Sequence, residues 1–308
     1  MRAHLREPAG RAAPGRSPAV WCLRPIPALI NSQAHEVSGA GSKLRFVIII
    51  EPTGGLGNRM RAIDSAIAIA DKMRRPLRVI WPISPELACG FDDLFERPGV
   101  ITDVSELDFS KLRDVLRYRL VLPLIRRRNR AYRDKDHHWL QTKGLDFRHV
   151  GQRVLHYKIC QPFYANPRPF AEFRPTGTLQ SRIGALARPY SVGVHIRRSD
   201  NENAISGSPT ERFVDLMKEE ISHDPGVEFF LATDSIDEER TLRKLFPTRV
   251  RTQEGKALDR RTPQAARDAL VDLFTLAACR KIIGSHFSSF TDVAAALRGV
   301  PLVIASTT

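Results

Sequence analysis

Two kinds of hydrophobic pattern alternate along the chain from about residue 45 onward. Short, β-branched runs such as "RFVIIIEP" (45–52) and "PLRVIW" (76–81) predict strands that are buried on both faces. Between them, "RMRAIDSAIAIADKM" (59–73) repeats apolar residues every three or four positions, which predicts a helix. A strand, a glycine turn, a helix and a second strand form a βαβ unit, and such units build parallel sheets.

The last third of the chain shows this alternation most regularly. Strands are predicted at 190–196, 227–233 and 281–285, with shorter ones near 248–251 and 300–306. The helices predicted between them cover 208–221, 237–246, 263–279 and 291–299. Two of these helices begin with the spacing of a capping box, which is formed by Ser208 with Glu211 and by Ser235 with Glu238.

The region 83–185 has weaker patterns. The segments "CGFDDLFE" (89–96) and "VITDVSELDF" (100–109) are expected to form short helices and turns. The predicted organisation is a disordered tail over 1–43, an N-terminal α/β domain over 44–185 and a Rossmann-like α/β domain over 186–308. The predicted fold class is therefore α/β, with two doubly wound domains.

Composition limits the class of protein further. Of 308 residues, 42% are hydrophobic and 27% are charged, which is typical of a soluble globular protein. No apolar run reaches about 18 residues, so no membrane span is expected. The four cysteines are widely spaced and form no CxxC pair, which indicates neither a zinc site nor a disulfide framework and favours a cytoplasmic location.

The net charge of +14 is concentrated in two segments. Residues 1–45 contribute +5, and their content of proline, glycine, alanine and arginine is typical of a disordered tail. Residues 111–148 contribute +8. This second segment is interpreted as a solvated helix with a basic loop, or as a surface for an acidic or sugar-rich partner. An RNA-binding function would have to use it, but its aromatic residues are few and scattered, so no nucleic acid partner is expected.

Neither metal-binding pattern in the basic segment is convincing. Asp134-Lys135-Asp136 has the DxD form that some metal-dependent sugar transferases use, but no apolar strand precedes it. His137 and His138 are adjacent, whereas a metal-binding pair on a helix needs a spacing of four. No metal site is predicted.

The glycine loop "TGGLGN" (53–58) fits neither common phosphate-binding motif. A Walker loop requires Lys after its last glycine, but Asn58 follows Gly57. A dinucleotide fingerprint requires a third glycine where Met60 stands and an acid after the next strand, which ends in Trp81-Pro82. The loop is therefore either a tight turn or a place where backbone and the Asn58 amide approach a ligand at a helix N-terminus.

Polar residues follow three predicted strands of the last third. In parallel sheets ligands bind beyond the carboxyl ends of the strands, so these residues are expected on one rim. An arginine pair suits a diphosphate, although adjacent side chains alternate faces and converge only if the chain turns after the strand. Asp234 is placed to accept a hydrogen bond from a base or ribose, and the alternative for Arg197 is a surface ion pair with Asp200. The residues concerned are His195, Arg197, Arg198, Asp234, Ser285, Ser288 and Ser289.

Four segments together resemble a known family. "GGLGNR" (54–59), "VHIRRSD" (194–200), "FFLATDS" (229–235) and the stretch 268–297, which contains "SHFSSF", are similar to the nodulation-type and core α1,6-fucosyltransferases. The protein O-fucosyltransferases are more distantly similar. The resemblance runs from about Arg45 to the C-terminus. It implies a GT-B fold with two domains facing across a cleft, GDP-fucose as donor, inversion at the sugar carbon and no metal or other cofactor.

The resemblance also implies roles for single residues. Arg197 and Arg198 would hold the donor diphosphate, His195 would help to form the nucleotide pocket, and Asp234 would bind guanosine. Two further groups complete the expected donor site: Ser288, Ser289 and Phe290 beside the phosphates, and Gly55, Gly57 and Asn58 facing the sugar from the other domain.

The mechanism leaves two points open. Inversion needs a general base, and Asp200, Glu202 and Glu51 are all candidates. The acceptor is expected to be a glycan or another polar hydroxyl. The alternatives are a non-catalytic GDP-sugar-binding protein, a transferase for another nucleotide sugar, and an RNA-binding protein that uses 111–148.

Overall fold

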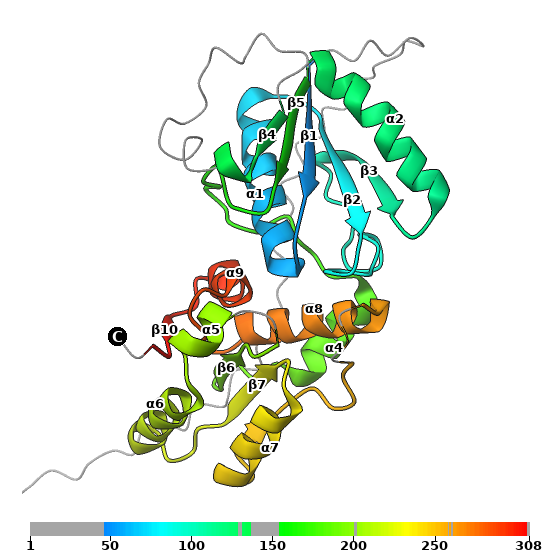
Figure 1. Cartoon of the computed structure of the whole chain (residues 1–308). Helices are drawn as coiled ribbons and strands as arrows, with labels where there is room; N and C mark the ends of the chain where they lie inside the picture. The colour runs from blue at the N-terminus through cyan, green and yellow to red at the C-terminus, as the bar shows by residue number, and fades with distance from the viewer. Residues whose placement is uncertain are drawn as a thin grey trace, which may run out of the picture. The chain divides into compact units, whose positions relative to one another are not determined.

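The computed structural model describes residues 46–128, 131–136, 154–199, 202–257, 259 and 261–306. The chain divides into the units Met1–Ser42 and Lys43–Thr308. The predicted tail, 1–43, lies outside the described residues. In the second unit the strands form two sheets of five, and every pair of neighbouring strands is parallel (Figure 1).

The first sheet has the order β3-β2-β1-β5-β4. The predicted strand β1 and helix α1 are confirmed, and all six residues of β1 are buried. The segment predicted as helices and turns at 100–109 is instead the strand β3. Three of its eight residues, Ile101, Val104 and Leu107, are buried, and β3 forms an edge of the sheet. The elements are β1 (Val47–Pro52), α1 (Leu56–Met73), β2 (Leu77–Ile83), β3 (Ile101–Asp108), α2 (Leu112–Arg128), β4 (Ala131–Arg133), a 3-10 turn η1 (Asp134–Asp136) and β5 (Val154–Ile159).

The second sheet has the order β10-β9-β6-β7-β8, which confirms the parallel sheet predicted for the last third. The five predicted strands and four predicted helices are present, and α4 and the short α5 are added. The elements are α4 (Gly177–Leu186), β6 (Val192–Ile196), α5 (Glu202–Gly207), α6 (Thr210–His223), β7 (Phe229–Thr233), α7 (Ile236–Leu245), β8 (Val250–Arg251), α8 (Pro263–Ala277), β9 (Lys281–Gly284), α9 (Ser289–Arg298) and β10 (Leu302–Ile304).

The central strand β6 buries both of its faces, each in a different core. Val192, Val194 and Ile196 pack with apolar residues of α6 and α7. The intervening Gly193 lies against α8, because a Cβ added to it would come within 2.8 Å of the Leu276 side chain. Odd-numbered residues of β6 therefore point toward α8 and α9, and even-numbered residues toward α6 and α7.

Helix α4 lies next to α8 and crosses residue 185, where the division between two domains is predicted. Arg182 of α4 forms an ion pair with the buried Asp268 of α8. This contact ties the end of the first predicted domain to the second sheet, and the domain limits at 44–185 and 186–308 stay a prediction.

Of the two predicted capping boxes, the one at Ser208 is wrong, and only the serine half of the one at Ser235 is present. The Ser235 N–H donates to Thr233 and not to Glu238. The Ser208 hydroxyl accepts a hydrogen bond from the backbone N–H of His286, at 2.8 Å, and does not cap α6. Ser235 does cap α7, accepting from the Glu238 N–H at 3.3 Å. In the described part of the chain no helix has the length and apolar character needed to cross a bilayer.

Candidate functional site

The carboxyl ends of β6, β7 and β9 meet, as the sequence predicts. The backbone N–H of Arg197 donates to the Ser285 hydroxyl, at 3.0 Å, and the N–H of Arg198 donates to the Asp234 carboxylate, at 2.7 Å. The residues that follow β6 are therefore held by polar side chains from both neighbouring strands. The rim predicted from the strand ends is confirmed.

The two adjacent arginines point in different directions. Arg197 continues the odd-numbered face of β6 and lines the cavities next to α8 and α9. Arg198 continues the even-numbered face, where its Nε lies 2.6 Å from Glu238 of α7 and its Nη2 donates to Thr210 of α6. The expected convergence of the two guanidinium groups is therefore wrong, because the alternation of the strand persists through residue 198. The role of Arg198 at a diphosphate stays a prediction.

Asp234 uses both carboxylate oxygens within the protein. One accepts the Arg198 N–H, and the other accepts the Ser199 hydroxyl at 2.7 Å and pairs with Arg197 at 3.1 Å. Burial alone would raise the pKa of Asp234, but the Arg197 guanidinium and these hydrogen bonds hold it below its usual value. Asp234 is thus ionised near neutral pH and fixes the loop after β6. Its predicted contact with guanosine stays a prediction.

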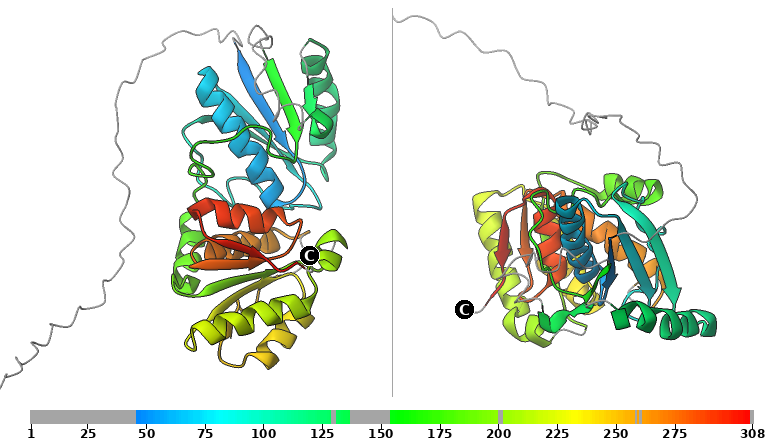
Figure 2. Two further views of the ribbon diagram at one scale, coloured as in Figure 1. Left: turned by 90° about the vertical axis from the view of Figure 1, so that its left-hand side faces the viewer. Right: turned by 90° about the horizontal axis from the view of Figure 1, so that it is seen from above.

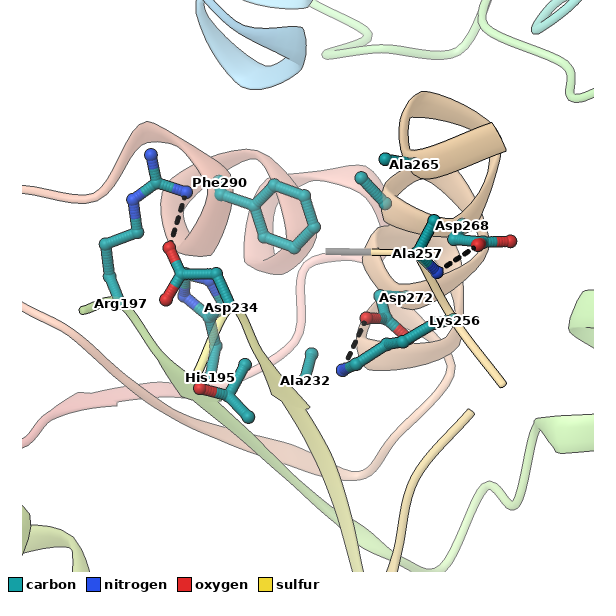
Figure 3. A pocket seen from close by; sticks show the side chains of 12 residues that line it. His195, Arg197, Ala232, Asp234, Lys256, Ala257, Ala265, Asp268, Asp272 and Phe290 are labelled. Atoms are coloured by element: carbon teal, nitrogen blue, oxygen red, sulfur yellow. Dashed lines mark hydrogen bonds and ion pairs between the residues drawn. The ribbon is translucent and has the colours of Figure 1, made fainter. Parts of the chain in front are cut away.

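A small cavity of about 80 Å³ lies between the end of β6 and α8 (Figure 3). His195 forms part of its wall, stacked on Phe290 with ring centroids 4.7 Å apart, and its Nδ1 lies 2.6 Å from the Thr291 hydroxyl. Burial, followed by the nearby Arg197 charge, lowers the pKa of His195 well below its ordinary value. His195 is therefore a neutral wall residue, next to the charged Arg197.

The far wall of the small cavity contains carboxylates that the sequence analysis missed. Asp268 and Asp272, one turn apart on α8, both line it. Asp268 is engaged by Arg182, by Gln264 and by the Ala257 N–H. The Oδ2 of Asp272 accepts from Lys256 at 3.3 Å, whereas its buried Oδ1 has no hydrogen-bond partner among the described residues. Burial raises the pKa of Asp272 to about 6 despite Lys256.

The signal for these residues was present in the sequence. Acids at a spacing of four within "DALVDLFTLAA" fall on the buried stripe of an otherwise apolar helix. Charged groups in such positions are rare unless they are paired or functional. Only the structure shows that one carboxylate oxygen of Asp272 is buried without a hydrogen-bond partner among the described residues.

A larger cavity of about 860 Å³ adjoins the small one. The two share Arg197, Phe290 and two alanines of α8. Its walls include the predicted loop residues Gly55, Gly57 and Asn58 at the start of α1, together with Ser288, Ser289 and Phe290 at the start of α9. The two helix starts are in close contact, since a Cβ on Gly57 would lie 2.9 Å from the Ser289 carbonyl oxygen. Every glycine-loop and serine-loop residue predicted for the donor site therefore lines one cavity.

Two carboxylates also line the larger cavity, and neither was predicted. Asp292, in the first turn of α9, lies 3.9 Å from Arg61 of α1, and its side chain is 56% exposed. Burial raises the pKa of Asp292, and Arg61 partly offsets this effect. Glu86 is bound by the Ser84 hydroxyl, and this hydrogen bond lowers its pKa. Asp292 is thus the more weakly held of the two.

The general-base candidates taken from the sequence lie elsewhere. Glu51 is buried against Lys158 and Tyr118. Burial would raise its pKa, but hydrogen bonds from His156, Lys158 and Tyr118 lower it to about 2. Glu202 begins the short helix α5, is exposed and is not among the residues that line the two cavities. Asp200 lies outside the described residues.

The DxD segment has a structural role where it is described. Asp134 accepts the backbone N–H of Cys160, and Asp136 accepts that of Arg133. His137 and His138 lie outside the described residues. Within the described ranges no group of three or more His, Cys, Asp or Glu side chains is arranged to hold a metal ion.

Comparison with solved structures identifies the fold. The NodZ α-1,6-fucosyltransferase, solved from Bradyrhizobium and also after soaking with GDP-fucose, aligns over 84% of this chain and 94% of its own, with 19% identity and a TM-score of 0.60. Arabidopsis thaliana FUT1 in complex with GDP aligns over 87% of this chain and 71% of its own, with 14% identity and a TM-score of 0.56. The chain has the GT-B fold.

A third structure with this fold, POFUT1 in complex with GDP, aligns over 86% of this chain and 99% of its own, with 13% identity and a TM-score of 0.51. No protein-family model matches the sequence, and no curated protein matches it significantly. The likeness therefore rests on the path of the backbone. In a GT-B chain the carboxyl ends of the strands carry the ligand sites, which is where both cavities lie.

Proposed function

We propose that this protein is a glycosyltransferase that moves fucose from GDP-fucose to a hydroxyl of a glycan or other polar acceptor. One observation carries the proposal: Arg197 lies where the small cavity, with the partly unpartnered Asp272 carboxylate, opens toward the larger cavity. A nucleoside diphosphate sugar has three parts in the same order: a base for the small cavity, a dianionic diphosphate for Arg197 and a sugar for the larger cavity. The fold of the GDP-binding and GDP-fucose-binding fucosyltransferases supports this choice of donor.

The small cavity suits guanine. The base offers two N–H donors on one edge, N1–H and the 2-amino group, and a carboxylate accepts such a pair side by side. The buried Oδ1 of Asp272, which has no hydrogen-bond partner among the described residues, provides the acceptor, and the nearby Lys256 favours the ionised form of the carboxylate. The stacked pair of His195 and Phe290 provides a neutral wall. Adenine and uracil can each offer a carboxylate one N–H donor but lack the adjacent pair of donors that guanine presents.

The leaving diphosphate is stabilised without a metal ion in this proposal. The Arg197 guanidinium carries a permanent positive charge and can donate two hydrogen bonds to a phosphate at once. Ser288 and Ser289 add hydroxyls and the backbone N–H groups at the start of α9, where the helix dipole favours an anion. These donors are fixed before the reaction, and Arg198 positions the same loop through Glu238 and Thr210.

Transfer then occurs by a single inverting displacement. The acceptor oxygen forms a bond to the anomeric carbon while the bond to the β-phosphate breaks, and its electron pair leaves with GDP. The acceptor proton passes to a carboxylate. Asp292 is the best placed of the described carboxylates, because it lines the larger cavity and its nearest charged partner, Arg61, lies 3.9 Å away.

The test combines binding with turnover. The full chain is screened by thermal shift against GDP, UDP, ADP and NAD, each with EDTA and with Mg²⁺. We expect stabilisation by GDP alone, unchanged by EDTA, and slow release of GDP from GDP-fucose that accelerates with a suitable acceptor. Stabilisation by UDP only, or only with a metal, would refute the proposed donor. Binding of GDP-fucose without any turnover across an acceptor panel would instead establish a non-catalytic sugar-nucleotide-binding protein.

A further inference from the structure

The outer face of α2 carries a stripe of exposed leucines. Leu112, Leu116 and Leu120 are 72%, 47% and 66% exposed, and their spacing of four places them on one side of the helix. Four of the ten large hydrophobic residues that are exposed in the described part of the chain lie between Phe109 and Leu120. Single exposed leucines are ordinary, but a contiguous row of them marks an interaction surface.

This stripe faces away from the rest of the described protein. The opposite side of α2 holds the helix on the sheet, where buried Asp114 accepts the Asp108 N–H and the Tyr118 hydroxyl donates to Glu51 at 2.6 Å. At about 100° per residue, the mean direction of the three leucines lies roughly 180° from that of Asp114 and Tyr118. Figure 2 shows α2 on the face of the first sheet opposite α1, with no other described element beyond it.

Positive charge borders the stripe on both sides. Arg113 and Arg117 follow it along one edge and Arg119 along the other, and all three are exposed. The single acid between 111 and 120 is Asp114, which faces the sheet and lies 3.4 Å from the Arg113 guanidinium. The helix ends in Arg126-Arg127-Arg128, in the segment that holds most of the excess charge of the folded part.

The occupant must therefore offer an apolar layer bordered by anions. A second copy docked on the same stripe would bring two sets of arginines together, which is unfavourable. RNA would pair with the arginines but leave the leucines in water. A bilayer with anionic headgroups satisfies both features, since the acyl chains cover the leucines while the phosphates meet the guanidinium groups.

We propose that α2 lies in the plane of an anionic membrane surface, with Leu112, Leu116 and Leu120 inserted at the level of the acyl chains and Arg113, Arg117 and Arg119 at the phosphates. The inference goes beyond the transfer reaction and does not depend on it. It attaches the protein by one amphipathic helix at the surface, as a peripheral protein.

The test uses the full chain without nucleotide in co-sedimentation with extruded vesicles. Binding is expected to vesicles of phosphatidylcholine containing phosphatidylglycerol, to be much weaker on phosphatidylcholine alone, and to fall as salt is raised. The triple variant Leu112→Ser, Leu116→Ser, Leu120→Ser should lose about tenfold or more of the partition coefficient. A control variant with Ile236→Ser and Leu245→Ser removes two equally exposed apolar residues of α7 and should bind like the parent.

A second variant tests the same surface of α2 if the serine variant does not fold. Arg113→Gln, Arg117→Gln and Arg119→Gln together should weaken binding to anionic vesicles and remove most of its salt dependence. Three results would overturn the proposal. They are equal vesicle binding by both variants and the parent, tight RNA binding that survives the serine variant alongside no vesicle binding, and a dimer in light scattering that the serine variant dissociates.

Discussion

At the scale of single residues, the two neighbouring arginines that follow β6 make different contacts. Arg197 lies beside Asp234 and both cavities, and Arg198 pairs with Glu238 on the other face. Each ion pair is partly shielded from water; Asp234 directly follows β7, and Glu238 lies in the first turn of α7. The loop is thereby held before any ligand arrives, which is the condition for electrostatic stabilisation of a leaving group.

Replacing Arg197 by alanine is expected to weaken GDP binding by about 10- to 100-fold, since each charge-assisted hydrogen bond is worth roughly 1.5–3 kcal/mol. Asp234 keeps its hydrogen bonds from Arg198 and Ser199, so the fold should persist. Isothermal titration with GDP measures the change, with Arg240→Ala, an exposed arginine of α7, as the control. Unchanged GDP affinity in Arg197→Ala would remove this residue from the site.

The Asp272 carboxyl is expected to lower the free energy of unfolding at neutral pH, although it contributes to GDP binding in the proposed site. Its pKa is about 6 in the folded protein against an ordinary value of 3.8, so the folded state binds this proton more tightly than the unfolded state. The stabilisation that comes from this tighter proton binding is fully present below about pH 4 and is lost as the pH rises through 6. At pH 7 the buried charge lowers the free energy of unfolding by roughly 2–3 kcal/mol.

Asp272→Asn should therefore raise the melting temperature at pH 7 more than at pH 4.5, while GDP affinity at pH 7 falls by about tenfold. Melting curves at the two pH values and GDP titrations measure both effects. The exposed Asp215→Asn serves as the control and should change neither. A destabilised Asp272→Asn protein at pH 7 would contradict the argument.

Asp292 provides a separate test of the chemistry. Asp292→Asn should lower kcat by about 100-fold or more, the usual size of a general-base effect, with GDP affinity unchanged. Because burial raises the pKa of Asp292, the parent enzyme should lose activity on the acidic side as this carboxyl becomes protonated, and the variant should lack that limb. Equal kcat values would assign the proton to another group.

At the scale of elements, what the sequence predicts depends on how local the determinants are. The strands of the second sheet and helix α8 follow from runs of apolar residues that need no knowledge of the rest of the chain. Strand β3 was missed because its buried residues come at intervals of three and are separated by polar residues, which is not the alternation typical of a strand. The Ser208 cap was wrong because a distant backbone N–H, that of His286, competes for the hydroxyl.

The candidate site divides in the same way. Glycines, arginines and serines at strand ends could be predicted, since position along the chain places them on a rim. The separation of Arg197 from Arg198 could not be predicted, because it depends on whether the backbone turns at one residue. The carboxylates Asp272 and Asp292 sit on helices, and their approach to the rim depends on how those helices pack.

The contact between the starts of α1 and α9 makes a sharp prediction at this scale. In Gly57→Ala the new Cβ would lie 2.9 Å from the Ser289 carbonyl oxygen and 3.1 Å from the Phe290 nitrogen, and backbone atoms cannot move aside cheaply. We expect a loss of roughly 1–3 kcal/mol in the free energy of unfolding, together with weaker GDP-fucose binding.

Gly55→Ala is the matched control for this contact. Gly55 has φ near −75°, and its nearest atom to an added Cβ is 4.0 Å away. Denaturant unfolding of both variants should separate them clearly. Equal stabilities would show that the two helix starts can move apart, and that the larger cavity does not depend on their close approach.

At the scale of the whole molecule, the first 42 residues contribute positive charge but none of the described core residues. The core-cluster residues that the structure describes lie between positions 48 and 305, and β1 begins at Val47. Deleting residues 1–42 removes one of the two units, whose five arginines and two glutamates give it a net charge of +3.

The shortened chain, Lys43–Thr308, is therefore expected to melt within about 2 °C of the full chain, because it keeps every described core residue and the change should stay well below 1 kcal/mol. GDP affinity should also be equal, since the described residues that line the two cavities lie between 54 and 292. Vesicle binding should be retained, because the arginines and leucines of α2 remain. Calorimetry and the two binding assays on matched samples measure all three, and a drop of 5 °C or more would show that the first 42 residues pack against the fold.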